Sequence, residues 1–221
     1  MKKLFSLNVF GISLVLAGSL VSNSNAATVW TNWESATLGT NGTAIGSLGN
    51  VSITYNGQLL NNTNISGNST LWNPLTTYIG GSVDASPAVV GDILTLNQSP
   101  GIITFSSTVT NPLIAFWSLG QPGIPASFEF NATPVVQAGG PNSIYGGSSI
   151  TVTGNSVLGS EGNGIVLFEG EFKTIAWTNT YENYYGITVG TAKPVPVPAG
   201  AWLFFTGMAS LIGITKFRRK C

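Results

Sequence analysis

Histidine is absent from this chain of 221 residues. Ser-His-Asp triads, Cys-His pairs and histidine-ligated metals all need an imidazole, so these mechanisms are excluded. A carboxylate pair of the glycosidase type remains available. The closest pair in sequence, Glu169 and Glu171, flanks Gly170, and that glycine indicates a turn with two solvated carboxylates. The sequence therefore predicts no catalytic residue and a protein that is not an enzyme.

Cysteine is almost as scarce, with a single residue at Cys221. No disulfide can form within the chain, so a hydrophobic core must hold the fold. Residues 27–192 are numerous enough for one domain that buries roughly two-thirds of its unfolded surface. We therefore expect one domain over 27–192 that folds without covalent cross-links.

Charged side chains make up only 7% of the sequence and are unevenly placed. Between residues 27 and 192 there are 8 acids and 1 base, Lys173, which gives a net charge of −7. The acids are Glu34, Asp84, Asp92, Glu129, Glu161, Glu169, Glu171 and Glu182. Nucleic-acid binding depends on Lys and Arg at phosphates, so nucleic acid is excluded as a partner.

The first 26 residues have the pattern of a secretory signal peptide. Lys2 and Lys3 precede an apolar segment over 4–20, and Ser24 and Ala26 place small residues at the −3 and −1 positions of a cleavage site. This pattern predicts export and removal of residues 1–26 by signal peptidase after Ala26. An uncut N-terminal anchor is the alternative.

The last residues have three parts. Prolines at 194, 196 and 198 keep the chain extended, so a helix can begin only at Ala199. Residues 199–215 carry no charge and predict a short transmembrane helix. A basic tail over 216–221 follows and predicts a cytoplasmic membrane stop formed by Lys216, Arg218, Arg219 and Lys220. A buried core helix is the alternative for 199–215.

This ending resembles the PEP-CTERM sorting signals of Gram-negative bacteria, and in particular their VPLPA-CTERM variant. The resemblance lies in Val195, Pro196, Val197, Pro198 and Ala199, followed by the apolar run and the basic tail over 193–221. Val197 stands where the variant usually has Leu. The resemblance implies recognition and cutting by an exosortase. It also implies an inner-membrane-anchored precursor that is passed to the cell surface or exopolysaccharide matrix.

The domain between these ends is predicted to be β-structure, because apolar alternation and β-branched residues recur without a helical period. Strands are expected at 28–33, 51–55, 75–79, 93–96, 102–105, 112–119, 127–130, 135–136, 149–153, 164–168, 172–177 and 185–189. A turn at Asn56-Gly57 is expected to end the second strand, with a surface loop over 58–70. Turn signals at short intervals predict an antiparallel β-sandwich of jelly-roll type.

Two kinds of ligand site can be considered from the sequence. Calcium, which takes oxygen ligands, is an open alternative to no cofactor, with Glu34, Asp84, Asp92 and Glu161 lying near Asn and Gly. No ordered calcium-loop pattern is present. Aromatic rings stack on sugars, and a mixture of rings with a carboxylate suits a sugar-binding rim. That mixture occurs at Tyr181, Glu182, Tyr184 and Tyr185, whereas Trp117 and Trp177 are expected in the core.

Two functional hypotheses remain. The first is a non-enzymatic, structural or adhesive protein of the cell surface or exopolysaccharide matrix. The second is a carbohydrate-binding module that acts on exopolysaccharide, with carbohydrate cleavage as its less favoured form.

Overall fold

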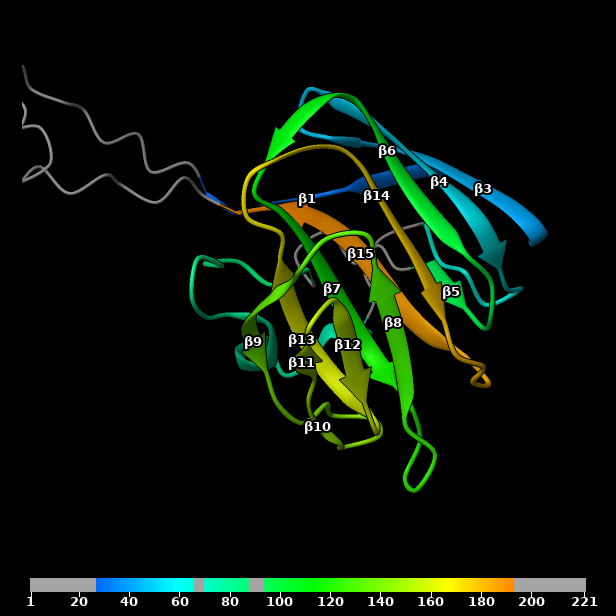
Figure 1. Ribbon diagram of the computed structural model, residues 1–221, viewed down its shortest axis with the longest axis vertical. Helices are drawn as coiled ribbons and strands as arrows, with labels where there is room; N and C mark the ends of the chain where they lie inside the picture. The colour runs from blue at the N-terminus through cyan, green and yellow to red at the C-terminus, as the bar shows by residue number, and fades with distance from the viewer. Residues whose placement is uncertain (1–26, 66–69, 88–93, 193–221) are drawn as a thin grey trace, which may run out of the picture.

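The computed structural model describes residues 27–65, 70–87 and 94–192. They form two β-sheets that pack face to face (Figure 1). The helical elements in these ranges include two short 3-10 turns, η1 (Thr70–Trp72) and η2 (Leu75–Tyr78). The expected all-β class and sandwich are therefore confirmed.

The first sheet has seven strands. Its main order is β1 (Val29–Trp30), β15 (Tyr185–Thr191), β7 (Pro112–Leu119), β13 (Gly162–Leu167) and β10 (Ser148–Ser149). In addition, β5 (Leu94–Leu96) pairs with β15, and β9 (Val135–Gly139) pairs with β13.

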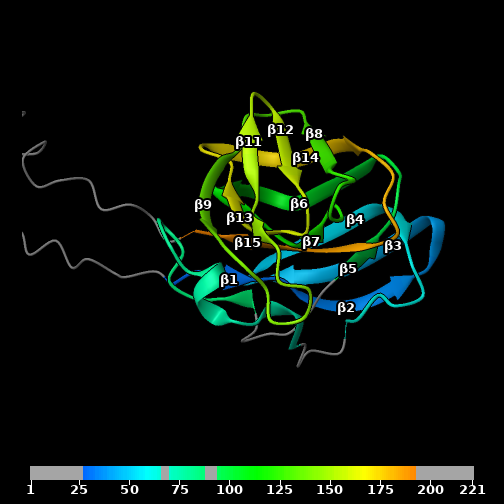
Figure 2. The same cartoon turned by 90° about the horizontal axis from the view of Figure 1, so that it is seen from below.

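The second sheet has eight strands. Their order is β11 (Thr151–Thr153), β12 (Ser156–Gly159), β8 (Ala126–Phe130), β14 (Glu171–Asn179), β6 (Gly101–Thr110), β4 (Val51–Leu59), β3 (Gly39–Leu48) and β2 (Asn32–Thr37). Figure 2 shows this sheet running from β11, β12 and β8 at one end to β2 at the other. The described pairings are antiparallel apart from the two-residue parallel pair of β10 with β13.

Strand β7 is the centre of the first sheet and is buried along its whole length. One face, including Ile114 and Phe116, contributes to the core between the sheets. The other face, including Leu113 and Trp117, belongs to a second apolar cluster. This confirms the expected central strand, whose apolar side chains on both faces reflect burial on both sides.

Aromatic rings fill the core between the sheets. The ring centroid of Phe128 lies 5.0 Å from that of Phe116 and 5.0 Å from that of Tyr185, and both pairs are edge to face. It lies 5.7 Å from the ring centroid of Trp177. Edge-to-face pairs at these separations add to the stability that apolar burial already provides. Trp117 and Trp177 are both buried, as expected.

The strand expected at 75–79 is wrong, because residues Leu75–Tyr78 form the 3-10 turn η2. The Thr77 amide donates to the Pro74 carbonyl at 3.0 Å, which closes a tight turn. Tyr78 then packs edge to face on Trp72, with ring centroids 5.1 Å apart. These two rings lie in the apolar cluster that includes Leu113 and Trp117. Tertiary packing on the first sheet therefore overrides the local β preference of the segment.

The turn expected at Asn56-Gly57 is also wrong, since β4 continues through it to Leu59. Its partner is β3, a glycine-rich strand that the sequence pattern does not reveal. At Gly46 a Cβ atom would collide with the carbonyl oxygen of Asn32 on β2, so the close approach of these strands requires glycine. Pairing with β3 extends β4 beyond the local turn signal.

The expected signal peptide (1–26) and sorting signal (193–221) lie outside the described residues. Within residues 27–65, 70–87 and 94–192, no helix has the length and apolar character needed to cross a membrane.

Candidate functional site

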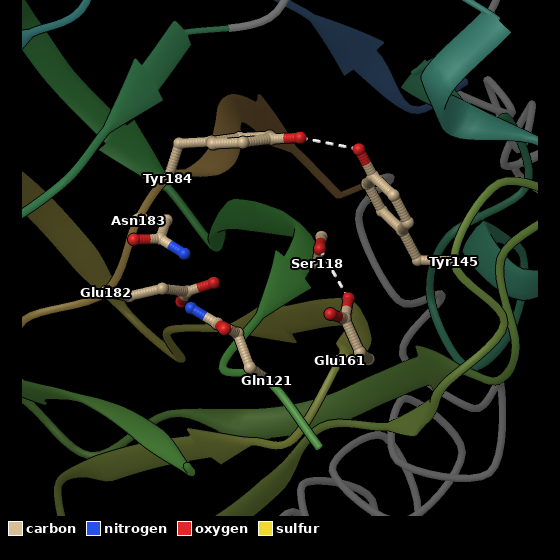
Figure 3. A pocket seen from close by; sticks show the side chains of 7 residues that line it. All are labelled: Ser118, Gln121, Tyr145, Glu161, Glu182, Asn183 and Tyr184. Carbon is tan, nitrogen blue, oxygen red and sulfur yellow. Dashed lines mark hydrogen bonds between the residues drawn. The ribbon is translucent and has the colours of Figure 1, made fainter. Parts of the chain in front are cut away.

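A pocket of about 160 Å³ lies near the end of β7, at one end of the first sheet. Its lining comes from four segments that are distant in sequence and consists of Ser118, Gln121, Tyr145, Glu161, Glu182, Asn183 and Tyr184 (Figure 3). Pockets that enclose whole drug-sized ligands are usually larger, about 300–1,000 Å³. A pocket of this size suits a single small chemical unit, such as one residue of a longer polymer.

Glu182 is the deepest ionisable group of the pocket, with only 4% of its surface exposed. Its carboxylate accepts a hydrogen bond of 2.6 Å from the Gly120 amide. Burial raises the pKa of Glu182 to about 7; the Gly120 bond opposes this rise, and the charge of Glu161 adds to it. Near neutral pH this carboxyl group therefore exists in both protonation states.

A second carboxylate, Glu161, is held by an unusual piece of backbone. Ser118 Oγ donates a 2.5 Å hydrogen bond to Glu161, and both residues have positive φ, 54° and 53°. The buried Asn163 fixes them: its side chain accepts from the Ser118 amide at 2.9 Å and donates to the Glu161 carbonyl at 2.9 Å. Left-handed backbone at non-glycine residues is uncommon and persists where the surroundings enforce it.

The opposite side of the pocket is aromatic. The Tyr145 and Tyr184 hydroxyl oxygens are hydrogen-bonded at 2.5 Å, and Figure 3 shows this pair above the two carboxyl groups. Trp117 supports both rings, stacked on Tyr184 at 6.0 Å and tilted against Tyr145 at 5.6 Å. The hydrogen bond with Tyr145 and burial raise the pKa of Tyr184 to about 12. The Tyr184 phenol is therefore a neutral hydrogen-bonding group at physiological pH.

The four residues expected to contact sugar are only partly brought together. Glu182 and Tyr184 line the pocket, whereas Tyr181 is 59% exposed and is not part of the lining. Tyr185 is fully buried in the core between the sheets, so its ring is not available to a ligand at the surface. The alternation of β15 explains this inward direction, because Tyr185, Ile187 and Val189 share the strand face that packs in the core.

The sequence did not predict Tyr145 as a site residue, and it indicated Glu161 only as a possible calcium ligand. Tyr145 lies in the segment between β9 and β10, and Glu161 between β12 and β13. The local signals in the sequence are that Tyr145 precedes two glycines and that Glu161 lies within Ser-Glu-Gly-Asn-Gly. Their proximity in space could not be predicted without the strand order.

The calcium candidates are not assembled into a common site in the described residues. Among these residues no group of three or more His, Cys, Asp or Glu side chains is placed to hold a metal. Asp84 accepts from the Thr28 amide at 2.8 Å, and Glu34 is exposed on β2. Asp92 lies outside the described residues. Glu169 and Glu171 are both exposed on either side of Gly170, where φ is 110°, as expected for a turn.

The residues of the predicted cleavage site (Ser24, Ala26), sorting motif (Val195 to Ala199) and membrane stop (Lys216, Arg218, Arg219, Lys220) lie outside the described residues. Their assignments stay predictions.

A second hollow of about 470 Å³ lies where β3 begins and β4 ends, with Gly39, Gln58 and Asn62 in its lining. Where the structure describes it, its lining carries amides but no charged or aromatic side chain. The first pocket, with two carboxyl groups, two amides, a hydroxyl and two phenols, offers the richer set of groups for recognition.

This chain was compared with protein-family models, curated proteins and solved structures, and none of them matches it. The site itself must therefore indicate the chemistry. Its acceptors, donors and ring faces suit a compact polar ligand with several hydroxyl or amine groups.

Proposed function

We propose that this protein is exported to the cell surface or exopolysaccharide matrix, where it has a non-enzymatic, adhesive role. Delivery requires signal peptidase, a transient membrane span and exosortase processing at Val195 to Ala199. The N-terminal charge and apolar pattern and the three-part ending support this sequence of events. The fold is compatible with it: Val29 pairs with Thr191, so both ends of the domain leave the sandwich at the same edge (Figure 1).

Within this role, we propose that the domain binds carbohydrate. The observation that supports this is the pocket itself, where Tyr145 and Tyr184 face the carboxyl groups of Glu161 and Glu182. Sugars are recognised by aromatic faces together with paired acceptors and donors. The pocket fits one sugar unit of an exopolysaccharide, with the chain extending outward.

We also propose a jelly-roll topology for the sandwich. The support is the order β5-β15-β7-β13 in one sheet and β6-β14-β8-β12 in the other. Numbered one to eight along the chain, these strands have the order 1-8-3-6 in the first sheet. In the second sheet their order is 2-7-4-5. Two interleaved Greek keys produce this order.

Carbohydrate binding is tested with the full chain in a sugar-free detergent on a glycan array. We expect saturable binding to at least one glycan class and its loss in Tyr184→Ala. The matched control is Tyr181→Ala, which removes an exposed tyrosine of the same segment that does not line the pocket. Absence of binding to every glycan, or equal loss in both variants, would contradict the proposal.

Sorting is tested by expressing the protein in strains with and without an exosortase and measuring the mass of the surface form by mass spectrometry. We expect the segment after about Pro198 to be lost only when the enzyme is present. An unshortened product in both strains would rule out processing at this motif.

A further inference from the structure

We propose that the pocket selects sugars that carry a free, protonated amino group over neutral and acidic sugars. This inference rests on the proposed carbohydrate binding and adds the class of ligand. It is drawn from the charge of the pocket, from the free positions on its carboxyl groups and from the adjoining rings.

The part of the pocket formed by described residues contains two carboxyl groups and no cation. Of the described residues, its lining includes Glu161 and Glu182 but no Lys or Arg. The only base between residues 27 and 192 is Lys173. Its Nζ atom donates to the Ser106 carbonyl of β6 at 2.8 Å, in the other sheet. A bound ammonium group would supply the charge that the protein does not provide.

In their hydrogen bonds to the described residues, Glu161 and Glu182 each use one carboxyl oxygen. Oε2 of Glu182 accepts from the Gly120 amide, and Oε2 of Glu161 accepts from Ser118 Oγ. The second oxygen of each group can accept from a ligand. An ammonium group has three donors in a compact arrangement, which matches acceptors that converge from two sides.

The rings favour the same ligand. In Figure 3 the ring of Tyr184 is seen edge-on above Glu182 and Asn183, so one ring face is directed toward the carboxyl side of the pocket. A cation near the face of a tyrosine ring is attracted by the negative potential of the ring. Trp117 and the hydrogen bond to Tyr145 hold this ring in place.

The same charges disfavour acidic sugars. A uronic acid would bring a third carboxylate beside Glu161 and Glu182, and like charges at close range repel. A neutral N-acetylated sugar avoids this repulsion but gains no ion pair. The expected order of affinity is therefore free amine, then neutral sugar, then acidic sugar.

The test uses the full chain in a sugar-free detergent, titrated calorimetrically at about pH 7, where Glu182 is partly ionised before the ligand binds. An ammonium group and a carboxylate in contact each favour the charged form of the other. The ligands are a β-1,4-glucosamine oligomer, its fully N-acetylated counterpart of equal length, and a galacturonate oligomer. We expect the amine form to bind about tenfold more tightly than the acetylated form, with the acidic oligomer weakest.

Two variants assign the effect to the pocket. Glu161→Gln and Glu182→Gln should each reduce the preference for amine over acetylated sugar from about tenfold to near unity. Glu169→Gln, which removes an exposed acid of the same charge elsewhere, should keep the preference. Near-ultraviolet circular dichroism checks the folding of each variant; if Glu182→Gln does not fold, Glu161→Gln still tests the assignment.

The outcomes separate the two proposals. Equal or tighter binding of the acetylated oligomer overturns amine selection while carbohydrate binding stands. If none of the three oligomers binds and the glycan array also shows no binding, both amine selection and carbohydrate binding are overturned. Loss of the amine preference in Glu169→Gln would show general attraction to an acidic domain and would overturn the assignment to this pocket.

Discussion

Replacing Glu182 with Gln should change how the stability of the protein depends on pH. Burial raises the pKa of Glu182 from an ordinary 4.5 to about 7. Between these values the unfolded chain has lost the proton, whereas the folded protein keeps it. The free energy of unfolding therefore falls as pH rises from 4.5 to 7 and is unaffected by this group above that range. Glutamine can still accept from the Gly120 amide but does not titrate.

The magnitude follows from the two pKa values. Each pH unit between them corresponds to about 1.4 kcal/mol, so the full interval would give about 3 kcal/mol. The carboxyl group borders the open pocket, and solvent screening reduces this to about 2 kcal/mol. For a domain of this size, that corresponds to a Tm difference of about 4–8 °C.

Urea denaturation of the wild-type protein and Glu182→Gln from pH 4.5 to 8 measures the effect. The variant should gain about 2 kcal/mol relative to wild type across this range, with most of the change below pH 7. Glu169→Gln, at an exposed position, should show no such trend. Parallel pH profiles for wild type and Glu182→Gln would refute the reasoning, because Glu182 would then titrate alike in both states.

Three further predictions concern the surroundings of the pocket and the core between the sheets. Gly120 and Gly123 share a φ of 79°, but only at Gly120 would a Cβ atom strike a neighbouring carbonyl. In urea denaturation, Gly120→Ala should lower the free energy of unfolding by about 3 kcal/mol and Gly123→Ala by about 1 kcal/mol. Equal losses would contradict the steric argument. Phe128→Ala removes the ring that contacts four others and should cost about 3–5 kcal/mol; a cost under about 1 kcal/mol would show that the core does not depend on this ring. Tyr145→Phe removes the hydroxyl whose hydrogen bond is the largest cause of the raised pKa of Tyr184. Ultraviolet titration should therefore detect ionisation of Tyr184 at lower pH, and an unchanged pH for this ionisation would contradict that cause.

The fold class was predictable because it depends on local patterns. Strand β7 reads as apolar on both faces, and its burial on both faces follows directly. Strand β3 could not be predicted, because glycine and threonine replace the usual β-branched apolar alternation and only its neighbours explain them. The strand prediction at residues 75–78 is wrong for a related reason, because packing on the first sheet determines the conformation of η2.

The site was predictable only in part. Glu182 and Tyr184 were selected from a local mixture of rings and acid, and both line the pocket. Tyr185, the next residue, points into the core, and this one-residue alternation decides which tyrosine can meet a ligand. Glu161 and Tyr145 come from other segments, so their contribution depends on long-range strand pairing that composition does not reveal.

Strand β15 has a mechanical consequence for the adhesive role that we propose. It begins next to the pocket, at Tyr185, and ends at Thr191, close to the edge from which the proposed tether departs. If ligand and tether are pulled apart, tension passes along this strand over about 20 Å. Its neighbours β7 and β1 hold it through hydrogen bonds that lie across the pulling direction. These bonds resist the force together, in shear, so the ligand should be released before the strand is drawn out.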